Sequence, residues 1–166
     1  MAKLSTNLFR LTMALTIVGM IATAGCTKKP RPDEGAIPTA GADENLTGDS
    51  DSGTAVGLKS ITFPYDAFAL TSEAKAALKE NADILKGQSN LMIQVEGHAD
   101  QRGGIQYNIA LGEKRANAVR KYLMDLGISG DRITTISFGK ERPLNPAATE
   151  EAYAQNRRAN FVITSR

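Results

Sequence analysis

The stretch 97–103 holds the residues of this chain that are best suited to bind a ligand. It reads Gly-His-Ala-Asp-Gln-Arg-Gly, and the glycines at both ends allow the backbone to turn sharply and to approach a bound molecule. The Asp100 carboxylate can accept hydrogen bonds from an ammonium group. Arg115 follows Leu111 at helical spacing and so lies near an apolar stripe, where a guanidinium needs a partner. Asp100 and Arg115 together could hold the ammonium and carboxylate groups of an amino-acid head group.

The residues alone leave a second interpretation of this charge pair open. Asp100 and Arg115 could pair with each other and fix the start of the helix, and their spacing supports this as well as it supports ligand binding. A further positive segment, Asn156-Arg157-Arg158, could line the same pocket.

A catalytic interpretation would have to use Glu96, His98 and Asp100. These residues alternate along an extended segment and could project to one side as iron ligands or as acid and base groups. The chain has only one His, however, and no G-x-S-x-G or similar nucleophile motif. We therefore expect no enzymatic activity, and we interpret His98 as a loop histidine that hydrogen-bonds the backbone.

Composition limits the other function classes. The 166 residues include 20 Lys and Arg against 18 Asp and Glu, a net charge of +2, which is too small to direct the chain onto nucleic acid. One Cys and one His exclude an internal disulfide framework and an ordinary structural zinc site. We expect no metal and no cofactor.

Apolar periodicity predicts the elements that position these residues. Pro64 indicates a sheet edge or strand end for the first strand, and Gly127 is suited to cap the second helix. In chain order we expect a strand at 61–65, a helix from Thr71 or Ser72 to Gly87, a strand at 91–96, a helix from Gly104 or Asn108 to Leu126, a strand at 133–138, a short helix from Glu150 and a strand at 159–163. This βαβαβ(α)β order predicts an α+β fold, a mixed four-stranded sheet covered on one face by two main helices.

The N-terminal part divides into two segments. Lys3 and Arg10 precede the uncharged run from Leu11 to Ala24, and the small residues before Cys26 resemble a bacterial lipobox. This predicts a signal peptide at 1–25 and lipidation of Cys26; an ordinary signal peptide or an uncleaved anchor are the alternatives. Residues 26–57 are rich in Pro, Gly, Ser, Thr and Asp and predict a disordered linker, so that the folded domain spans 58–166.

Four segments of the folded domain resemble the OmpA-like C-terminal domain family, and within it the lipid-anchored peptidoglycan-associated lipoproteins. They read VEGHADQRG, YNIALGEKRANAVRKYL, ISFGKERP and AYAQNRRANFVI. The resemblance implies non-covalent binding of the meso-diaminopimelate peptide of peptidoglycan, with Asp100 and Arg115 on its zwitterionic end. Asn108 and Leu111 match the family's N-x-x-L and would support the loop, and Arg158 matches the second Arg of its NRR signature.

One position departs from the family pattern F-D-x-x-D. The chain has Ala69 where the second Asp is usual, whereas Asp66 and Phe68 remain candidate pocket walls. The resemblance also implies an outer-membrane location with the folded domain in the periplasm, and the protein TolB of the Tol system as a partner in cell division. A related peptidoglycan-binding lipoprotein that does not act with TolB is the alternative.

Overall fold

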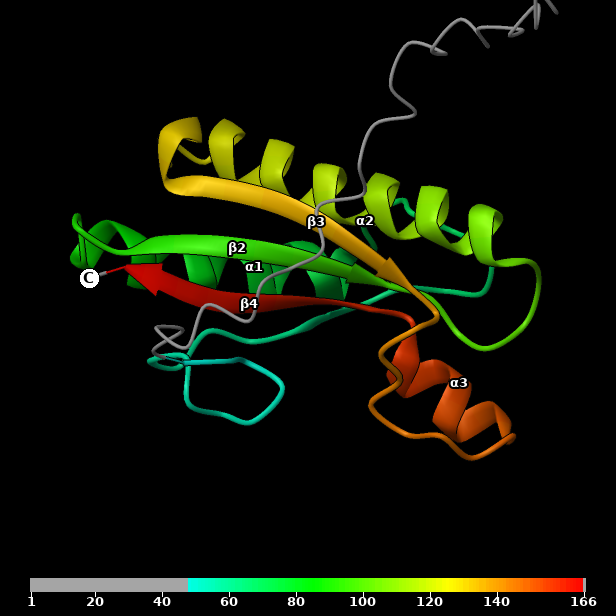
Figure 1. The fold of residues 1–166 in the computed structure, drawn as a ribbon. Coiled ribbons are helices and arrows are strands. Elements are labelled where there is room, and N and C mark those ends of the chain that lie inside the picture. Colours follow the sequence, from blue (N-terminus) through cyan, green and yellow to red (C-terminus); the bar gives the residue numbers. More distant parts are fainter. Residues whose placement is uncertain (1–47, 166) are drawn as a thin grey trace, which may run out of the picture. The chain divides into compact units, whose positions relative to one another are not determined.

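The computed structural model describes residues 48–165 of the chain (Figure 1). The expected signal peptide and Cys26 lie outside this range. Within it, no helix is long and apolar enough to cross a membrane. The elements are β1 (Ile61–Thr62), α1 (Ser72–Gly87), β2 (Met92–His98), α2 (Ile105–Asp125), the 3-10 helix η1 (Gly130–Arg132), β3 (Ile133–Gly139), α3 (Glu150–Asn156) and β4 (Arg158–Ser165).

The four strands form one mixed sheet in the order β1-β4-β2-β3. β2 runs parallel to β3 and antiparallel to β4, and β1 pairs antiparallel with β4 at the edge. The edge position predicted from Pro64 is confirmed, although β1 is shorter than expected. Phe63 still donates its N–H to the Arg157 carbonyl at 2.8 Å, but Pro64 has no N–H to continue the pairing.

Alternation along β2 and β4 gives the sheet two different faces. Ile93, Val95, Phe161 and Ile163 point to the core and are at most 1% exposed. α1 and α2 cover this face, which confirms the predicted α+β arrangement; Figure 1 shows α1 behind the sheet and α2 running along β3. The opposite face carries polar side chains.

The ends of the two main helices follow their local sequence. Thr71 caps α1, because its hydroxyl oxygen accepts the Ala74 N–H at 3.1 Å. α2 ends before Gly127, whose φ of 94° is the left-handed conformation expected of a C-terminal glycine. The limits expected for both helices agree with the structure to within a residue or two at most ends.

Two glycines allow α2 to lie directly on β2. A Cβ atom on Gly97 would clash with the Gly112 carbonyl oxygen, and one on Gly112 would lie 2.7 Å from the Gly97 carbonyl oxygen. Backbone therefore packs on backbone at this crossing, which fixes α2 close to the end of β2.

Residues 48–57, which we expected to belong to the linker, pack against the sheet instead. Ser50 donates its N–H to the Phe161 carbonyl at 2.9 Å, Ile163 donates to the Gly48 carbonyl at 2.8 Å, and Ala55 is fully buried. The low apolar content of this segment led us to expect no fixed structure. Backbone hydrogen bonds and polar side chains, rather than a large apolar surface, hold the segment against the sheet. The ordered part of the chain therefore includes residues before Leu58.

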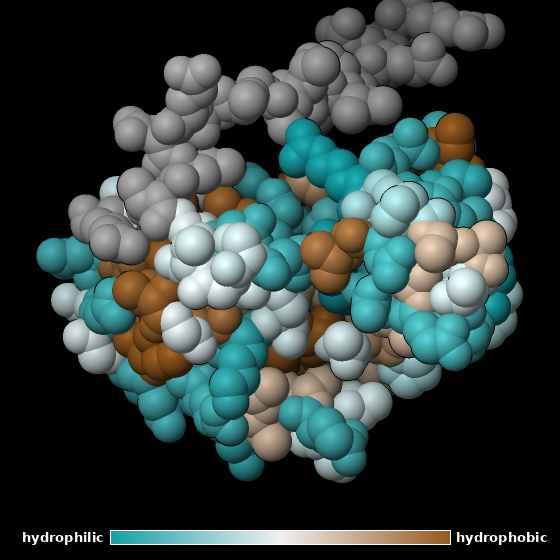
Figure 2. Space-filling model, turned by 90° about the horizontal axis from the view of Figure 1, so that it is seen from below, coloured by the Kyte–Doolittle hydropathy of each residue, from teal (hydrophilic) through white to brown (hydrophobic). Residues whose placement is uncertain are grey.

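On the face shown in Figure 2, hydrophobic residues form small clusters separated by hydrophilic ones.

Candidate functional site

A small cleft lies where β2 ends and α2 begins, and five of the residues singled out from the sequence line it. Its volume is about 60 Å³. Asp66, Asp100, Asn108, Leu111 and Arg115 are in its wall, as expected, together with Tyr65, Ala99, Arg102, Gly103 and Tyr107. We call this the Asp100 cleft.

Arg115 is completely buried and is held by backbone carbonyls. Its Nε donates to the Ala67 oxygen at 2.9 Å, Nη1 to the His98 oxygen at 2.7 Å and Nη2 to the Pro64 oxygen at 3.2 Å. These bonds use three of the five guanidinium N–H groups and leave one on each terminal nitrogen. Burial lowers the pKa of Arg115 to about 10, so the group remains charged at neutral pH.

Asp100 is buried too, and its partners are arginines other than Arg115. Arg102 donates to Asp100 Oδ2 from Nη2 at 2.6 Å and to Oδ1 from its backbone N–H at 3.1 Å, while Arg157 Nη1 lies 3.3 Å from Oδ2. Burial raises the pKa of Asp100, but the hydrogen bonds from Arg102 and Arg157 outweigh this and hold the pKa below its ordinary value. Asp100 is therefore a carboxylate at neutral pH.

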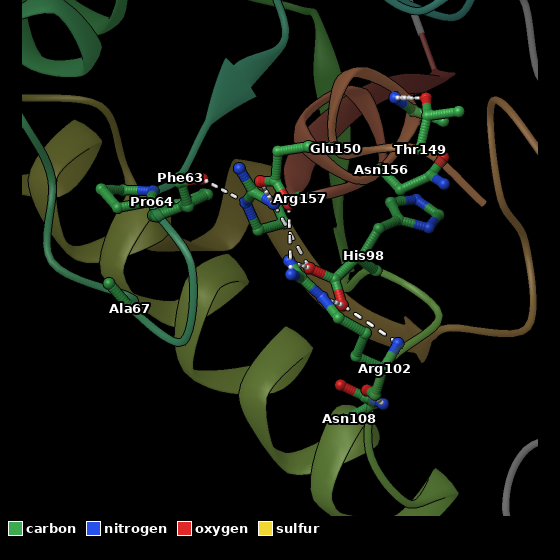
Figure 3. A network of polar contacts seen from close by, with 12 residues as sticks. Phe63, Pro64, Ala67, His98, Arg102, Asn108, Thr149, Glu150, Asn156 and Arg157 are labelled. Atoms are coloured by element: carbon green, nitrogen blue, oxygen red, sulfur yellow. Dashed lines mark hydrogen bonds and ion pairs between the residues drawn. The ribbon is translucent and has the colours of Figure 1, made fainter. Parts of the chain in front are cut away.

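Arg102 covers Asp100 on the solvent side. Its guanidinium lies between two aromatic rings, 4.2 Å from the centroid of Tyr65 and 4.6 Å from that of Tyr153. It also donates to Glu150 at 3.1 Å, and Asn108 Nδ2 holds its carbonyl at 2.7 Å. Figure 3 shows Arg102 and Asn108 together at the base of this network. Asn108 thus holds the loop through the Arg102 carbonyl, the supporting position that the family resemblance implied.

The three residues of the NRR segment point in three directions. Asn156 Oδ1 accepts the N–H groups of Leu144 and Asn145, at 2.7 and 3.0 Å. Arg157 donates to Asp100, to Glu150 Oε1 at 2.9 Å and to the Phe63 carbonyl at 3.1 Å (Figure 3).

Arg158, which we expected near the cleft, lies on the other face of the sheet. Its Nε donates to Asp51 Oδ2 at 2.6 Å. Successive residues entering a strand point to opposite faces. Arg157 therefore takes the place beside Asp100 that we had assigned to Arg158.

The structure places the three candidates before α1 differently. Asp66 lines the cleft and accepts a hydrogen bond from the Tyr107 hydroxyl. Phe68 and Ala69 are exposed and lie outside the cleft wall, with Lys114 Nζ 5.4 Å from the Phe68 ring centroid. The backbone of this segment reaches the site through the Pro64 and Ala67 carbonyls that hold Arg115.

The residues of the catalytic interpretation do not converge. Glu96 and His98 share the helix-free face of the sheet, whereas Asp100 lies past the end of β2 and faces Arg102 and Arg157. Residues 48–165 contain no group of three or more His, Cys, Asp or Glu side chains placed to hold a metal.

Sequence reasoning missed Tyr65, Arg102 and Tyr107 as parts of the site, and within the NRR segment it favoured Arg158 over Arg157. For Arg102 a signal was present, because a side chain two positions after a loop Asp can turn back onto its carboxylate. Tyr65, Tyr107 and Arg157 come from three separate segments, and only the tertiary fold brings them together.

Comparisons with known proteins show the family of the chain. The family model described as OmpA family matches residues 62–157. The chain is 38% identical to the peptidoglycan-associated lipoprotein of Pseudomonas aeruginosa, over 89% of this chain and 94% of the relative, and 38% identical to that of Rhizobium meliloti, over 90% and 85%. The crystal structure of the peptidoglycan-associated lipoprotein from Burkholderia pseudomallei superposes with a TM-score of 0.61 at 38% identity, covering 63% of this chain and 88% of that chain. A family match over more than half of the chain, a shared fold and relatives of nearly the same length together show that the chain belongs to the OmpA family.

Proposed function

We propose that this chain is an outer-membrane lipoprotein that attaches the membrane to peptidoglycan without catalysing a reaction. The Asp100 cleft binds the zwitterionic end of a meso-diaminopimelate stem peptide: Asp100 accepts hydrogen bonds from the ammonium group, and Arg115 donates to the carboxylate. The names of the relatives support association with peptidoglycan.

The state of Arg115 is the observation that carries this proposal. A fully buried guanidinium that three carbonyls hold in place keeps two N–H groups for a ligand, and it lines the same cleft as an ionised carboxylate. Burying such a charge is costly unless all of its donors find acceptors. A ligand carboxylate completes that set.

If an ammonium group binds at Asp100, the Arg102 guanidinium must give up part of its hydrogen bonding to the Asp100 carboxylate. The cleft admits only the end of a side chain, so the remainder of the peptide lies outside it. Because the Arg102 side chain is 35% exposed, it can turn toward Glu150 while the ligand takes its place.

Attachment to the membrane uses Cys26, which would carry the acyl chains that hold the N-terminal side of the chain in the outer membrane. The domain then works in the periplasm, where many weak contacts along one polymer add up to firm attachment. Cell-division function with TolB is part of the same proposal. A related peptidoglycan-binding lipoprotein that does not act with TolB is the second candidate, and co-purification with TolB distinguishes the two.

Calorimetric titration of the full chain tests the peptide site. The ligands are a stem peptide with meso-diaminopimelate and its Lys-containing analogue, which lacks the second carboxylate. We expect saturable binding of the first and at least about tenfold weaker binding of the second, about 1.4 kcal/mol. Asp100→Ala should abolish binding, whereas Asp131→Ala, an exposed residue outside the cleft, should not. Equal binding of both peptides would contradict the assignment.

A further inference from the structure

The helix-free face of the sheet carries a second and larger cavity. Its volume is about 550 Å³, within the range of ligand-binding sites. Its floor is formed by Glu96, His98, Arg158 and Asn160, and residues 48–54 and 142–144 form its sides. We call it the sheet-face cavity, because its floor lies on the face of the sheet opposite α1 and α2.

Two buried side chains in its floor have unused hydrogen-bonding atoms. His98 is 1% exposed and Arg158 is 5% exposed. Among residues 48–165, neither ring nitrogen of His98 nor Nη1 of Arg158 has a hydrogen-bond partner. The His98 ring, which we expected to bond to the backbone, points away from α2 in Figure 3, and its Nε2 is 3.5 Å from Glu96 Oε2, too far for a strong bond.

A buried polar atom without a hydrogen-bond partner destabilises the folded state. Such atoms are therefore expected mainly where a ligand or an ordered water supplies the missing hydrogen bond. The remaining members of the floor are paired. Asn160 Nδ2 donates to Glu96 Oε2 at 3.0 Å, and Arg158 Nε donates to Asp51. The free atoms therefore mark the positions that a bound molecule would complete.

The charges around the cavity argue against a simple anion. The carboxylates of Asp49, Asp51 and Glu96 line it, against the guanidinium groups of Arg142 and Arg158. A ligand that fits this set must both accept hydrogen bonds, from Arg158 and His98, and donate them to carboxylates. Hydroxyl groups and acetamido groups do both.

An extended peptide would lack its usual means of binding here. Peptides commonly dock by adding a strand to a free sheet edge. β2 is paired with β3 and β4, and β4 is paired with β2 on one side and with β1 and residues 48–50 on the other. The floor instead presents polar side chains that could bind the polar groups of a sugar ring. Pro143 and the half-exposed Leu144 offer apolar surface to the C–H groups of such a ring.

We propose that the sheet-face cavity is a saccharide-binding site for N-acetylated sugar units. The acetamido carbonyl accepts from Arg158 Nη1 and His98, and ring hydroxyls donate to Glu96. The natural source of the sugar, the glycan of the wall polymer, depends on the proposed function, but the chemistry of the site does not.

The single histidine of the chain provides the test, because its ring signals in an NMR spectrum are unambiguous. The full chain, labelled on histidine, is titrated with a tetramer of N-acetylglucosamine that carries no peptide. We expect a saturable shift of the His98 ring signals. Arg142 lines the cavity, and its guanidinium stacks on the Phe138 ring. Arg142→Ala removes this part of the cavity wall and should weaken binding of the tetramer about fivefold or more. Lys79→Ala, an exposed change on α1, should leave binding unchanged.

Three results would overturn the proposal: an unmoved His98 signal at millimolar tetramer, equal binding by the Arg142→Ala variant, or a shift produced by an uncharged Gly-Ala tetrapeptide and not by the sugar. Asp100→Ala separates this site from the peptide site. Tetramer binding that survives in this variant, beside lost stem-peptide binding, would confirm two independent sites. Failure of stem-peptide binding in the unaltered chain would contradict the proposed function and leave the saccharide site standing.

Discussion

Asp100 and Arg115 line one cleft, yet each is held by different partners. Arg115 donates to three backbone carbonyls, while Asp100 accepts hydrogen bonds from Arg102 and Arg157. The interpretation in which the two charges simply pair with each other is therefore wrong. Both groups are fixed in place without using each other, so a ligand can bridge them without breaking an Asp100–Arg115 ion pair.

Replacing Arg115 by Lys should impair both binding and stability. Lysine keeps the charge but cannot reach three carbonyls and a ligand carboxylate at once. We expect at least about tenfold weaker binding of the diaminopimelate peptide and a loss of about 2–4 kcal/mol in the free energy of unfolding, since buried carbonyls lose their donor.

Arg132→Lys is the matched control for this change. Arg132 also donates to three backbone carbonyls, those of Leu85, Gln88 and Leu91, but it lies away from the cleft. Urea unfolding should show destabilisation of both variants, and calorimetry should show normal peptide affinity for Arg132→Lys alone. Unchanged affinity in Arg115→Lys would contradict recognition by the planar guanidinium.

Removing the Arg102 side chain should strengthen binding. Arg102 competes with the ligand ammonium for Asp100, and the net contribution of such a partly buried hydrogen-bonded pair is about 1 kcal/mol. Arg102→Ala should therefore bind the peptide up to about fivefold more tightly. Weaker binding in calorimetry would instead mean that Arg102 contacts the ligand itself.

The crossing of α2 and β2 should not tolerate a larger residue. Gly97→Ala places a Cβ atom against the Gly112 carbonyl, and the backbone must shift to accept it. We expect a loss of about 3 kcal/mol or more in the free energy of unfolding. Gly87→Ala is the control, because a Cβ atom there meets nothing within 4 Å. Equal denaturation midpoints for the two variants would be inconsistent with this packing.

The contribution of Asp100 to stability should disappear in acid. Its pKa in the folded state is lowered, whereas in the unfolded chain it is about 3.9. The unfolded state therefore binds more protons near this pH, and the contribution is complete above the unfolded pKa and is lost as the pH falls through the folded pKa.

The measurement is the difference in unfolding free energy between the natural chain and Asp100→Asn. We expect about 2 kcal/mol at pH 6 and a steady decrease below pH 4. A difference that is constant over this range would show that the ionised form of Asp100 makes no special contribution.

Local patterns in the sequence were sufficient for most elements, and long-range contacts account for what they missed. The periodicity of α2 placed Arg115 on its buried side, and the alternation of 159, 161 and 163 identified the inner face of β4. Neither pattern indicates which carbonyls meet Arg115, because Pro64 and Ala67 approach from a distant segment. The NRR segment shows the same limit: alternation separates Arg157 from Arg158, but only the sheet order reveals which of them meets Asp100.

In the proposed attachment to membrane and peptidoglycan, the segment 48–51 would take the mechanical load before the rest of the domain. The chain leaves the sheet through the edge hydrogen bonds of residues 48–50 and the ion pair of Asp51 with Arg158. Tension between the N-terminal side and a ligand held at Asp100 reaches these bonds before it reaches either main helix. This strip should therefore yield first under force, lengthening the tether while α2, the end of β2 and the grip on the ligand remain intact.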